Sequence, residues 1–279
     1  MNFENYYRQV KQGFTHEKKG DVVFLTIPSF VEADGLVHAF TTRKTGVSKD
    51  GFASLNFSFG REKNPKNIKA NFEIIANTLG VLADDMVLDN YGHTPNVLNV
   101  TEEMRGAGVY NNAHLPTCDG LATVIKDLPL VTMHADCAAI FLYDPKKSAV
   151  CVCHAGWRGT AGGIVKNAVD MMTDKFGCRI EDILAGIGPC IQSCCFEIKS
   201  DVEKEFKDAF GDFSVEYREG KIFGDLEKGI VSCFMRAGIA PQNVTRSGEC
   251  TFCDEENYYS YRRQGQNGGA MASVVMLKK

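Results

Sequence analysis

Four common catalytic motifs are missing from this sequence. It contains no HExxH, no GxSxG, no phosphate-binding GxxxxGK[ST] loop and no GxGxxG fingerprint. Zinc proteases, serine hydrolases, P-loop enzymes and dinucleotide-binding folds therefore lose their sequence support. Cytidine-deaminase-type zinc enzymes need H-x-E followed by P-C-x-x-C. They are excluded too, because Pro189-Cys190 is followed by a cysteine only at position 194 and no glutamate lies two residues after a histidine.

The chain also lacks an excess of positive charge and any long apolar segment. Its 31 lysines and arginines are outnumbered by 35 aspartates and glutamates, which gives a net charge of −4. Such a chain has no overall basic field to bind a phosphate backbone, so we expect no nucleic-acid partner. No apolar run approaches the roughly 20 residues that cross a bilayer, and residues 1–20 lack the apolar stretch of a secretory signal. We expect a soluble, cytoplasmic protein with no membrane partner, and no pattern predicts its oligomeric state.

Cysteine, by contrast, is abundant. The 279 residues contain 11 cysteines at irregular spacing. An odd, irregular set in a chain without a secretory signal does not indicate a disulfide framework. We expect most of these thiols to be buried and to pack as small hydrophobic groups. The 44% hydrophobic and 24% charged fractions are typical of a globular enzyme, and we predict a single domain over 1–279, with residues 1–20 as a candidate peripheral extension.

Helical and strand patterns alternate along the chain, which predicts a mixed α and β fold. Asn64 and Pro65 begin a helix with one apolar face, and Gly80 ends it in a left-handed cap. Ser200 and Glu203 form a capping-box pattern at the start of another helix. The apolar patterns predict strands over 130–133, 149–153, 183–187, 243–247 and 271–277, and further helices over 160–177, 200–210 and 225–237.

Two of the predicted strands end in groups that titrate or bind metals. The first strand is followed by His134-Ala135-Asp136-Cys137, and the second leads directly into His154. If the two strands are neighbours, Cys137 and His154 lie at the same edge of the sheet, where open α/β sheets bind ligands. A thiolate with an imidazole suits zinc, and copper(I) is the alternative. A strand-end histidine and a buried thiol also have ordinary structural roles, so both interpretations stay open.

His93 is the best candidate for a third ligand, because it lies in a short polar break between apolar positions. Catalytic zinc takes three protein ligands and keeps one position open. His38 lies in a strand-like run, where we expect a structural role. His16 and His114 lie in polar, loop-like contexts, where we expect solvation.

The glycine-rich turn after the second strand can bind an anion. Residues 156–163 offer backbone N–H groups at the start of a predicted helix, with Arg158 alongside. Glycines equally permit close packing of a helix on a sheet, and composition does not decide between the two. Tyr261-Arg262-Arg263 could also bind an anion, but a solvated turn is the favoured interpretation there. Trp157, the single tryptophan, is expected in the core.

Cys250 and Cys253 form a CxxC pair. Cys190, Cys194 and Cys195 could complete a four-cysteine zinc site, but their spacing is irregular, whereas such sites usually use a second regular pair. A thioredoxin-like redox role lacks the helix start and the βαβ context that it needs. The sequence therefore assigns this pair no role.

Several motifs occur together in the order found in one family. From about residue 38 to the C-terminus, the chain resembles the family of YfiH and YlmD proteins, once called laccase-domain or polyphenol oxidase proteins. The motifs that carry this resemblance are Thr41-Thr42-Arg43, Gly46-Val47-Ser48, Ser54-Leu55-Asn56, Cys118-Asp119-Gly120-Leu121, Ala135-Asp136-Cys137, His154-Ala155-Gly156-Trp157-Arg158-Gly159, Ile187-Gly188-Pro189-Cys190-Ile191 and Tyr258 to Arg263.

The resemblance implies a zinc-dependent purine nucleoside phosphorylase with adenosine deaminase and methylthioadenosine phosphorylase activity, whose partners are purine nucleosides and phosphate. It implies a zinc ion held by two histidines and one cysteine, which here are His93, Cys137 and His154. It also implies an α+β fold, in which two stacked mixed β-sheets form a single domain with helices on the outer faces.

Two motifs depart from the family pattern. Members usually read Gln-x-His-Gly at the first ligand, whereas Tyr91 and Thr94 stand here in place of the glutamine and the glycine. The C-terminal motif normally carries an arginine after its glycine, and Gly269-Ala270 stand there instead. These departures bear on the local loop, on substrate preference and on the binding of phosphate or ribose.

The expected chemistry follows from these residues. In deamination, the metal would lower the pKa of its water so that hydroxide attacks C6 of adenine. In phosphorolysis, phosphate would attack the sugar as the base departs. We expect phosphate near the glycine-rich turn, at Arg158, Gly159 and Arg43, and we expect Asp136 to shuttle a proton or to orient a ligand.

Three alternatives remain at this point. Cys137 as nucleophile with His154 as its base also fits a Cys-His hydrolase or deamidase. A copper-dependent polyphenol oxidase would need clustered histidines, and the six in this chain are scattered. A non-enzymatic role in binding a partner is the third.

Overall fold

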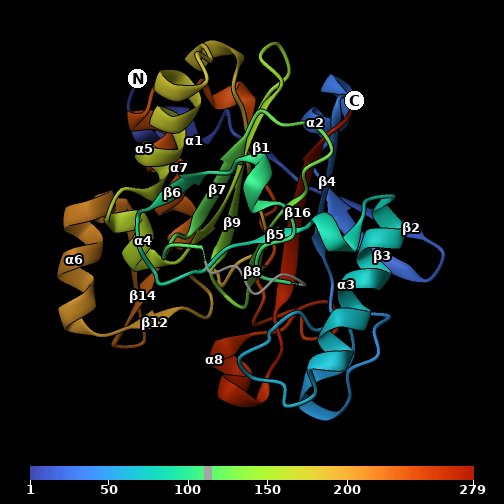
Figure 1. Cartoon of the computed structure of the whole chain (residues 1–279). Coiled ribbons are helices and arrows are strands. Elements are labelled where there is room, and N and C mark those ends of the chain that lie inside the picture. The colour runs from blue at the N-terminus through green and yellow to red at the C-terminus, as the bar shows by residue number, and fades with distance from the viewer. Residues whose placement is uncertain (110–114) are drawn as a thin grey trace.

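Two mixed β-sheets lie face to face at the centre of this computed structural model, which describes residues 1–109 and 115–279 (Figure 1). The six-stranded sheet has the order β2-β3-β4-β16-β8-β5 and the seven-stranded sheet the order β1-β15-β11-β9-β10-β7-β6. The first consists of β2 (Thr15–Lys19), β3 (Val22–Thr26), β4 (Leu36–Thr41), β16 (Met271–Leu277), β8 (Leu130–His134) and β5 (Val87–Leu88). The second consists of β1 (Lys11–Gln12), β15 (Val244–Arg246), β11 (Leu184–Ile187), β9 (Ala138–Asp144), β10 (Ala149–Ala155), β7 (Gly120–Thr123) and β6 (Val97–Asn99).

Helices cover the outer faces of both sheets. In Figure 1, α3 lies on one side of the molecule, and α5, α6 and α7 lie on the other. A small third sheet of β12 (Glu197–Ile198), β14 (Lys221–Gly224) and β13 (Val215–Arg218) accompanies the second group. The helices are α1 (Phe3–Tyr7), α2 (Pro28–Ala33), α3 (Pro65–Leu79), α4 (Trp157–Ala161), α5 (Ile164–Asp170), α6 (Ser200–Phe210), α7 (Leu226–Arg236) and α8 (Tyr261–Gln264).

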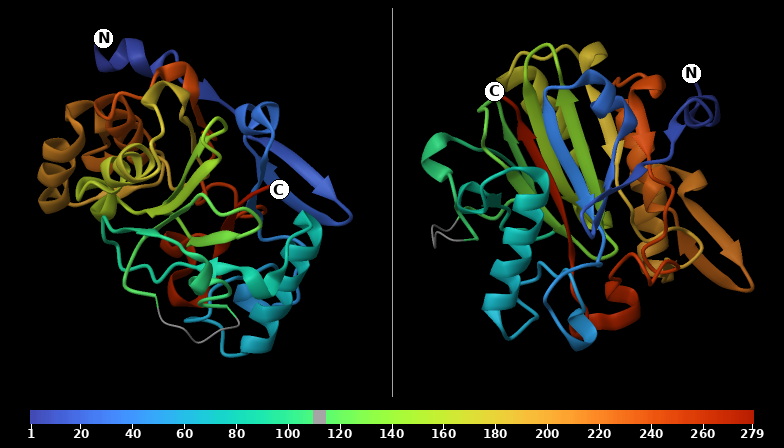
Figure 2. Two further views of the ribbon diagram at one scale, coloured as in Figure 1. Left: turned by 45° about the horizontal axis from the view of Figure 1, so that its top comes forward. Right: turned by 90° about the vertical axis from the view of Figure 1, so that its right-hand side faces the viewer.

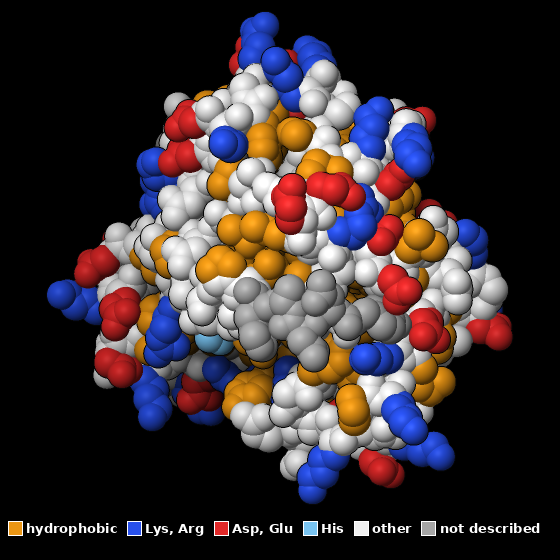
Figure 3. Space-filling model, in the orientation of Figure 1, with side chains coloured by type: hydrophobic (Ala, Val, Ile, Leu, Met, Phe, Trp, Pro, Cys, Tyr) orange, Lys and Arg blue, Asp and Glu red, His pale blue; other side chains and the backbone are white. Residues whose placement is uncertain are grey.

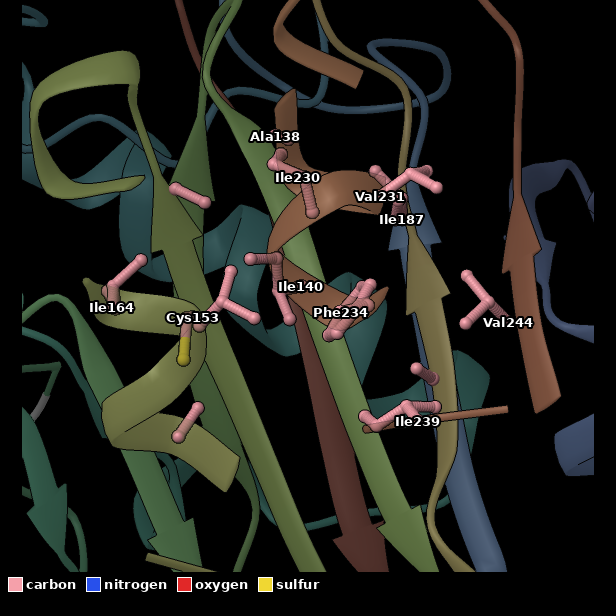
Figure 4. Close-up of a cluster of buried hydrophobic side chains, with 14 of the residues drawn as sticks. Ala138, Ile140, Cys153, Ile164, Ile187, Ile230, Val231, Phe234, Ile239 and Val244 are labelled. Atoms are coloured by element: carbon pink, nitrogen blue, oxygen red, sulfur yellow. The ribbon is translucent and has the colours of Figure 1, made fainter. Parts of the chain in front are cut away.

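Three hydrophobic clusters correspond to the three contacts between layers. Side chains alternate between the two faces of a strand. Along β9, Ile140 and Leu142 therefore pack under the helices, whereas Phe141 and Tyr143 pack between the sheets. Figure 4 shows the helix side of the seven-stranded sheet, with Ile140 beside side chains of α7. This arrangement confirms the predicted α+β fold of two stacked mixed sheets with helices outside, and Figure 2 shows it from two further directions.

The first 20 residues join the edges of both sheets. Strand β1 pairs in parallel with β15, and the exposed strand β2 pairs antiparallel with β3. Tyr6 of α1 is buried in the helix-side cluster and donates its hydroxyl to the carbonyl of Ile239, 2.6 Å away. The segment expected as a peripheral extension therefore also contributes to the core.

Most predicted elements are present, with two corrections. Helix α3 begins after Asn64, whose side chain accepts from the Lys66 N–H, and ends at Gly80 with a φ of 74°. The helix predicted over 160–177 is divided into α4 and α5 at Gly163, which has a φ of 101° and stops continuous helix. The capping box at Ser200 was wrong: the N-cap of α6 is Lys199, without a side-chain cap bond.

Within 1–109 and 115–279, the longest helix is α3 with 15 residues, and none is both long and apolar enough to span a membrane. His114 lies outside the described residues.

Candidate metal centre

Several connections pass from one sheet to the other at one end of the stack. The turn after β8 carries Cys137 from the six-stranded to the seven-stranded sheet, and the loop between β5 and β6 carries His93 across in the same sense. His154 lies near the end of β10, opposite Ala139 of the neighbouring strand β9. The premise that the two histidine-ending strands are sheet neighbours was therefore wrong, because β8 and β10 belong to facing sheets. The crossing connections, rather than one sheet edge, bring these side chains together.

His93, Cys137 and His154 converge so that one potential ligand atom of each lies within 4.8 Å of the other two. Two imidazoles and a thiolate form a donor set that suits zinc. The space beside them depends on a glycine: a Cβ on Gly156 would lie 3.0 Å from both Cys137 Sγ and His93 Nδ1. Donor set and space together fit a single metal ion with three protein ligands.

Asp119 organises both histidines from behind the site. This fully buried carboxylate accepts hydrogen bonds from the backbone N–H groups of Gly92, His93 and Thr94 at 2.8–3.0 Å. It also accepts from Nδ1 of His154 at 2.8 Å. Burial opposes its ionisation, but these bonds hold the pKa of Asp119 down at about 2. Because Nδ1 of His154 is the donor to Asp119, the Nε2 lone pair is left for the ligand position, as in many metal sites.

The cysteine and the histidine of the site influence one another strongly. Burial alone would raise the pKa of the Cys137 thiol, but the neighbouring His154 and His93 lower it to about 7. Burial would likewise lower the pKa of His154, whereas Cys137 and Asp119 raise it to about 10. The site thus favours a thiolate at Cys137, which is the form that binds a metal ion or acts as a nucleophile.

Asp136 holds the strand end in place. Its φ of 82° is in the left-handed region, where few non-glycine residues lie. Its Oδ1 accepts from the Thr251 hydroxyl at 2.7 Å and its Oδ2 from the Arg262 backbone N–H at 2.6 Å. Its own carbonyl accepts from the N–H of Ile191 at 2.9 Å. Asp136 therefore connects three loops around Cys137, which favours an orienting role.

A pocket of about 510 Å³ includes His93, Cys137 and His154 in its lining. Its size is that of a small-molecule site. Basic side chains and a histidine lie close together on the face shown in Figure 3. The walls combine aromatic and aliphatic side chains with two arginines: Ser58, Gly60, Arg61, Tyr91, His93, Met133, His134, Ala135, Asp136, Cys137, His154, Trp157, Ile191, Phe196, Leu226, Tyr261, Arg262, Gln266 and Ala270.

The predicted phosphate-binding residues lie elsewhere. Arg43 donates to the carbonyls of Ala53 and Glu255 and lies over the Tyr259 ring at 4.4 Å. Arg158 lies over Trp157, its own neighbour, at 4.3 Å. Neither arginine is among the residues that line the pocket.

Gly159 has a packing function. A Cβ at this position would lie 3.0 Å from the carbonyl oxygen of Thr94, so the glycine lets α4 approach the His93 loop closely. Trp157, expected in the core, both packs against the helix-side cluster and lines the pocket.

Sequence reasoning missed Asp119, Arg61 and Arg262 as site residues. Asp119 belongs to a recognised motif, but a carboxylate that contacts backbone N–H groups 25 to 27 residues away has no local spacing signal. Arg61 donates to the carbonyls of Gly268 and Gly269, at 2.8 and 3.2 Å, and these residues are 207 and 208 positions away in sequence. Arg262 was noted, but the pattern there favoured a solvated turn over an anion site.

The contacts of Tyr91 and Thr94, which replace the family's glutamine and glycine beside His93, fit the local structure. Thr94 donates both its N–H and its hydroxyl to Asp119, at 2.8 and 2.9 Å. Tyr91 places its ring 5.1 Å from that of His154 and lines the pocket. His38 is structural as predicted: it is buried in β4 and its Nε2 accepts from the Ile27 N–H at 2.8 Å.

Comparison with known proteins gives consistent matches over nearly the whole chain. A family model described as Multi-copper polyphenol oxidoreductase laccase matches residues 37–278. The chain is 32% identical over 249 residues to purine nucleoside phosphorylase YlmD of Bacillus subtilis, covering 88% of this chain and 89% of that protein. It is 34% identical over 209 residues to adenosine deaminase RL5 of an unknown prokaryotic organism, covering 73% and 79% of the two chains.

A mouse relative is longer than this chain. The purine nucleoside phosphorylase LACC1 of Mus musculus is 30% identical over 268 residues, which cover 94% of this chain but 60% of the mouse protein. Among solved structures, YfiH of Bacillus licheniformis superposes with a TM-score of 0.88 at 29% identity, covering 94% of this chain and 99% of that one.

Proposed function

Because this chain belongs to the YfiH and YlmD family, whose model is described as Multi-copper polyphenol oxidoreductase laccase, we propose that it is an enzyme acting on purine nucleosides. Specifically, we propose a zinc-dependent purine nucleoside phosphorylase with adenosine deaminase and methylthioadenosine phosphorylase activity. The names of the relatives support phosphorolysis and deamination. The observation that carries the proposal is the convergence of His93, Cys137 and His154 at a pocket with aromatic walls and two arginines.

Different side chains of the pocket wall suit the two substrates, a purine base and a phosphate. Tyr91, Trp157 and Phe196 offer ring faces and apolar contacts to a flat base. Arg61 and Arg262 offer positive charge in the same pocket, since an arginine retains its charge at neutral pH. We therefore assign phosphate binding to these two arginines. Arg43, Arg158 and Gly159, where the sequence led us to expect phosphate, are not among the residues that line the pocket.

Zinc, when bound by His93, Cys137 and His154, supplies a Lewis acid with one open position. The chain itself keeps the donors ready: Asp119 holds the proton on Nδ1 of His154 and the backbone of the His93 loop in place. Asp136 ties the strand end to the loops at Thr251 and Arg262, so we propose that it orients Cys137. In phosphorolysis, a phosphate oxygen bonds to C1′ of the sugar while the bond to the purine nitrogen breaks.

One alternative function has a specific observation in its favour. The low pKa of Cys137 and the high pKa of His154 describe a thiolate paired with an imidazolium, as in a Cys-His hydrolase. A nucleophilic pair needs one histidine, however, whereas His93 approaches as a second imidazole donor. Copper-dependent polyphenol oxidation would need more imidazoles than the two that meet at this site.

The activity assay tests the proposal directly. Adenosine, inosine and methylthioadenosine, each with and without phosphate, are incubated with the wild type and with His154→Ala, and the products are separated by chromatography. We expect phosphate-dependent release of the free base and phosphate-independent conversion of adenosine to inosine, both lost in the variant. Absence of base release from every nucleoside would contradict the proposed phosphorylase.

The zinc content of the purified protein distinguishes the proposed metal site from the Cys-His hydrolase. Stoichiometric zinc that is reduced by one ion per chain in Cys137→Ala supports the metal site. Active, metal-free protein whose Cys137 is labelled by iodoacetamide, with loss of activity, would support the Cys-His hydrolase instead.

A further inference from the structure

A second group of side chains converges outside the pocket. Cys194 and Cys195 lie between β11 and β12, and Cys250 and Cys253 lie between β15 and α8. Their four sulfur atoms all lie within 4.8 Å of one another. Cys253 Sγ is 3.5 Å from that of Cys194 and 3.3 Å from that of Cys195. The two segments are more than 50 residues apart in sequence, so this convergence is a product of the fold.

We propose that these four cysteines bind a structural zinc ion, separate from the three-ligand site. Four sulfur atoms at a tetrahedral zinc with Zn–S bonds of about 2.3 Å are separated by about 3.8 Å. The spacing of this cluster matches that of ligands to a single ion. Iron–sulfur clusters distribute their cysteines over two or more iron atoms, which separates the sulfurs more widely.

Disulfide bonds describe this arrangement less well. All four cysteines are free, and the 3.3 and 3.5 Å separations exceed the S–S bond length of about 2.05 Å. Cys253 lies at nearly equal distance from two sulfurs, although it can form a disulfide with only one. Four sulfur atoms that all lie close to one another are the arrangement expected of thiolates that share one metal ion.

The surroundings suit a site with four thiolates. Four thiolates and a divalent ion carry a net charge of −2, which requires nearby donors or positive charge. The backbone N–H of Gln192 donates to the sulfur of Cys250 at 3.5 Å. The guanidinium of Arg263 donates to the carbonyls of Thr251 and Phe252 at 3.0 and 2.6 Å, inside the CxxC loop. A cation is thus held beside the cluster.

The cluster also connects to the pocket through the backbone. Thr251, between the two cysteines of the CxxC pair, donates its hydroxyl to Asp136 and its N–H to the carbonyl of Cys190. Asp136 precedes the ligand Cys137. A zinc ion here would hold together the two loops that support the strand end, and its function would be structural because all four positions are protein ligands.

The adjacent pair at Cys194 and Cys195 explains why the sequence pattern was not decisive. Its irregular spacing led us to assign no role to the CxxC pair, whereas the fold supplies the missing ligands. Cys190, the third candidate, is buried and is not part of the group within 4.8 Å.

Zinc counting in purified, reduced protein tests the proposal. We expect two zinc ions per wild-type chain by mass spectrometry of the metal content, one in the double variant Cys250→Ser/Cys253→Ser, and one in Cys137→Ala. The matched control Cys233→Ser, which changes a cysteine outside both groups, should retain two. The proposal is wrong if the double variant retains the wild-type zinc content. It is also wrong if the reduced wild type contains no more zinc per chain than the double variant.

Cobalt substitution keeps the test valid if the double variant fails to fold. Cys137→Ala protein, stripped and loaded with Co²⁺, should show the intense thiolate charge-transfer absorption of a four-sulfur site, because its cluster is intact. Absence of this absorption overturns the proposal. So does a native mass 2 or 4 Da lower in protein purified with reductant, which indicates disulfides. A cluster that retains zinc while Cys137→Ala loses none would confirm this inference and contradict the catalytic site, so the two are tested separately.

Discussion

Within residues 1–109 and 115–279, two groups of side chains are arranged so that each could hold a metal ion, and they differ in composition and access. The His93, Cys137 and His154 site has mixed nitrogen and sulfur donors, a carboxylate behind it and a pocket in front. The cluster of Cys194, Cys195, Cys250 and Cys253 has sulfur donors alone and lies outside the residues that line the pocket. Three ligands leave room for a substrate, whereas four thiolates close the coordination shell. The number and type of donors are therefore the basis on which we propose a catalytic role for the first site and a structural role for the second.

Removing a ligand of the open site should have the largest effect. In His154→Ala, loss of the metal removes several kcal/mol of transition-state stabilisation, or about a thousandfold in kcat/KM. The measurement is phosphate-dependent base release. His16→Ala, which removes an exposed histidine paired with Glu249, is the matched control. Equal activity in the two variants would remove the open site from the mechanism.

Replacing the carboxylate behind the open site should have a smaller effect. Asp119→Asn keeps the size of the side chain but loses the charge that holds Nδ1–H of His154. We expect zinc affinity and activity to fall by about 10- to 100-fold, as for other partners of metal-bound histidines. Competition with a zinc chelator measures the affinity. An unchanged affinity would show that the carboxylate does not act through His154.

The arginines of the pocket should affect phosphate specifically. Arg262→Met removes charge from the pocket, and a charge-assisted hydrogen bond contributes about 1.5–3 kcal/mol, so we expect the KM for phosphate to rise about tenfold or more. Arg158→Met removes an arginine that lies over Trp157 instead and serves as the matched variant. Phosphate kinetics on both variants decide the assignment, and a larger effect at Arg158 would reverse it.

The smallest effect concerns His38, a buried histidine outside the candidate metal centre. Burial lowers the pKa of His38 to about 4, and its Nε2 accepts a hydrogen bond from Ile27. Below about pH 6.5, His38 binds a proton in the unfolded chain, whereas in the folded chain it stays neutral down to about pH 4. The free energy of unfolding therefore decreases as the pH falls through this window. Between pH 7 and 5.5 we expect a loss of about 1 kcal/mol. Denaturant unfolding of the wild type and His38→Gln at both pH values measures it; an equal loss in both proteins would assign the pH dependence to other groups.

The sequence predicted the layers, and it singled out His93, Cys137 and His154, which the fold brings together. Strands such as β9 and β10 are buried on both faces, so they read as apolar runs, and the glycine that ends α3 is a local signal. Residue type and the family motifs singled out these three candidate ligands. Pairing between strands is not local, however, and the assumption that β8 and β10 are neighbours was wrong although the residues it joined do meet.

Contacts across long sequence separations account for what the sequence left out. Asp119 reaches His154 over 35 residues, and the two cysteine pairs of the closed cluster meet over more than 50. No spacing rule connects such partners, because strand pairing brings them together. Asp119 precedes β7, which pairs with the strand that carries His154, and the two cysteine pairs follow the neighbouring strands β11 and β15. Arg61 was missed for the same reason, since its contacts at Gly268 and Gly269 lie more than 200 residues away in sequence. The expected phosphate residues Arg43 and Arg158 lie outside the pocket lining.

The most direct test is a titration of zinc into protein whose open site alone has been emptied by a mild chelator, with phosphate-dependent release of the purine base from adenosine or inosine as the readout. Activity that is absent before addition and is fully restored by one zinc ion per chain is the predicted result. Full turnover in the chelated protein, or no recovery after one ion per chain has bound, would contradict the central role of His93, Cys137 and His154.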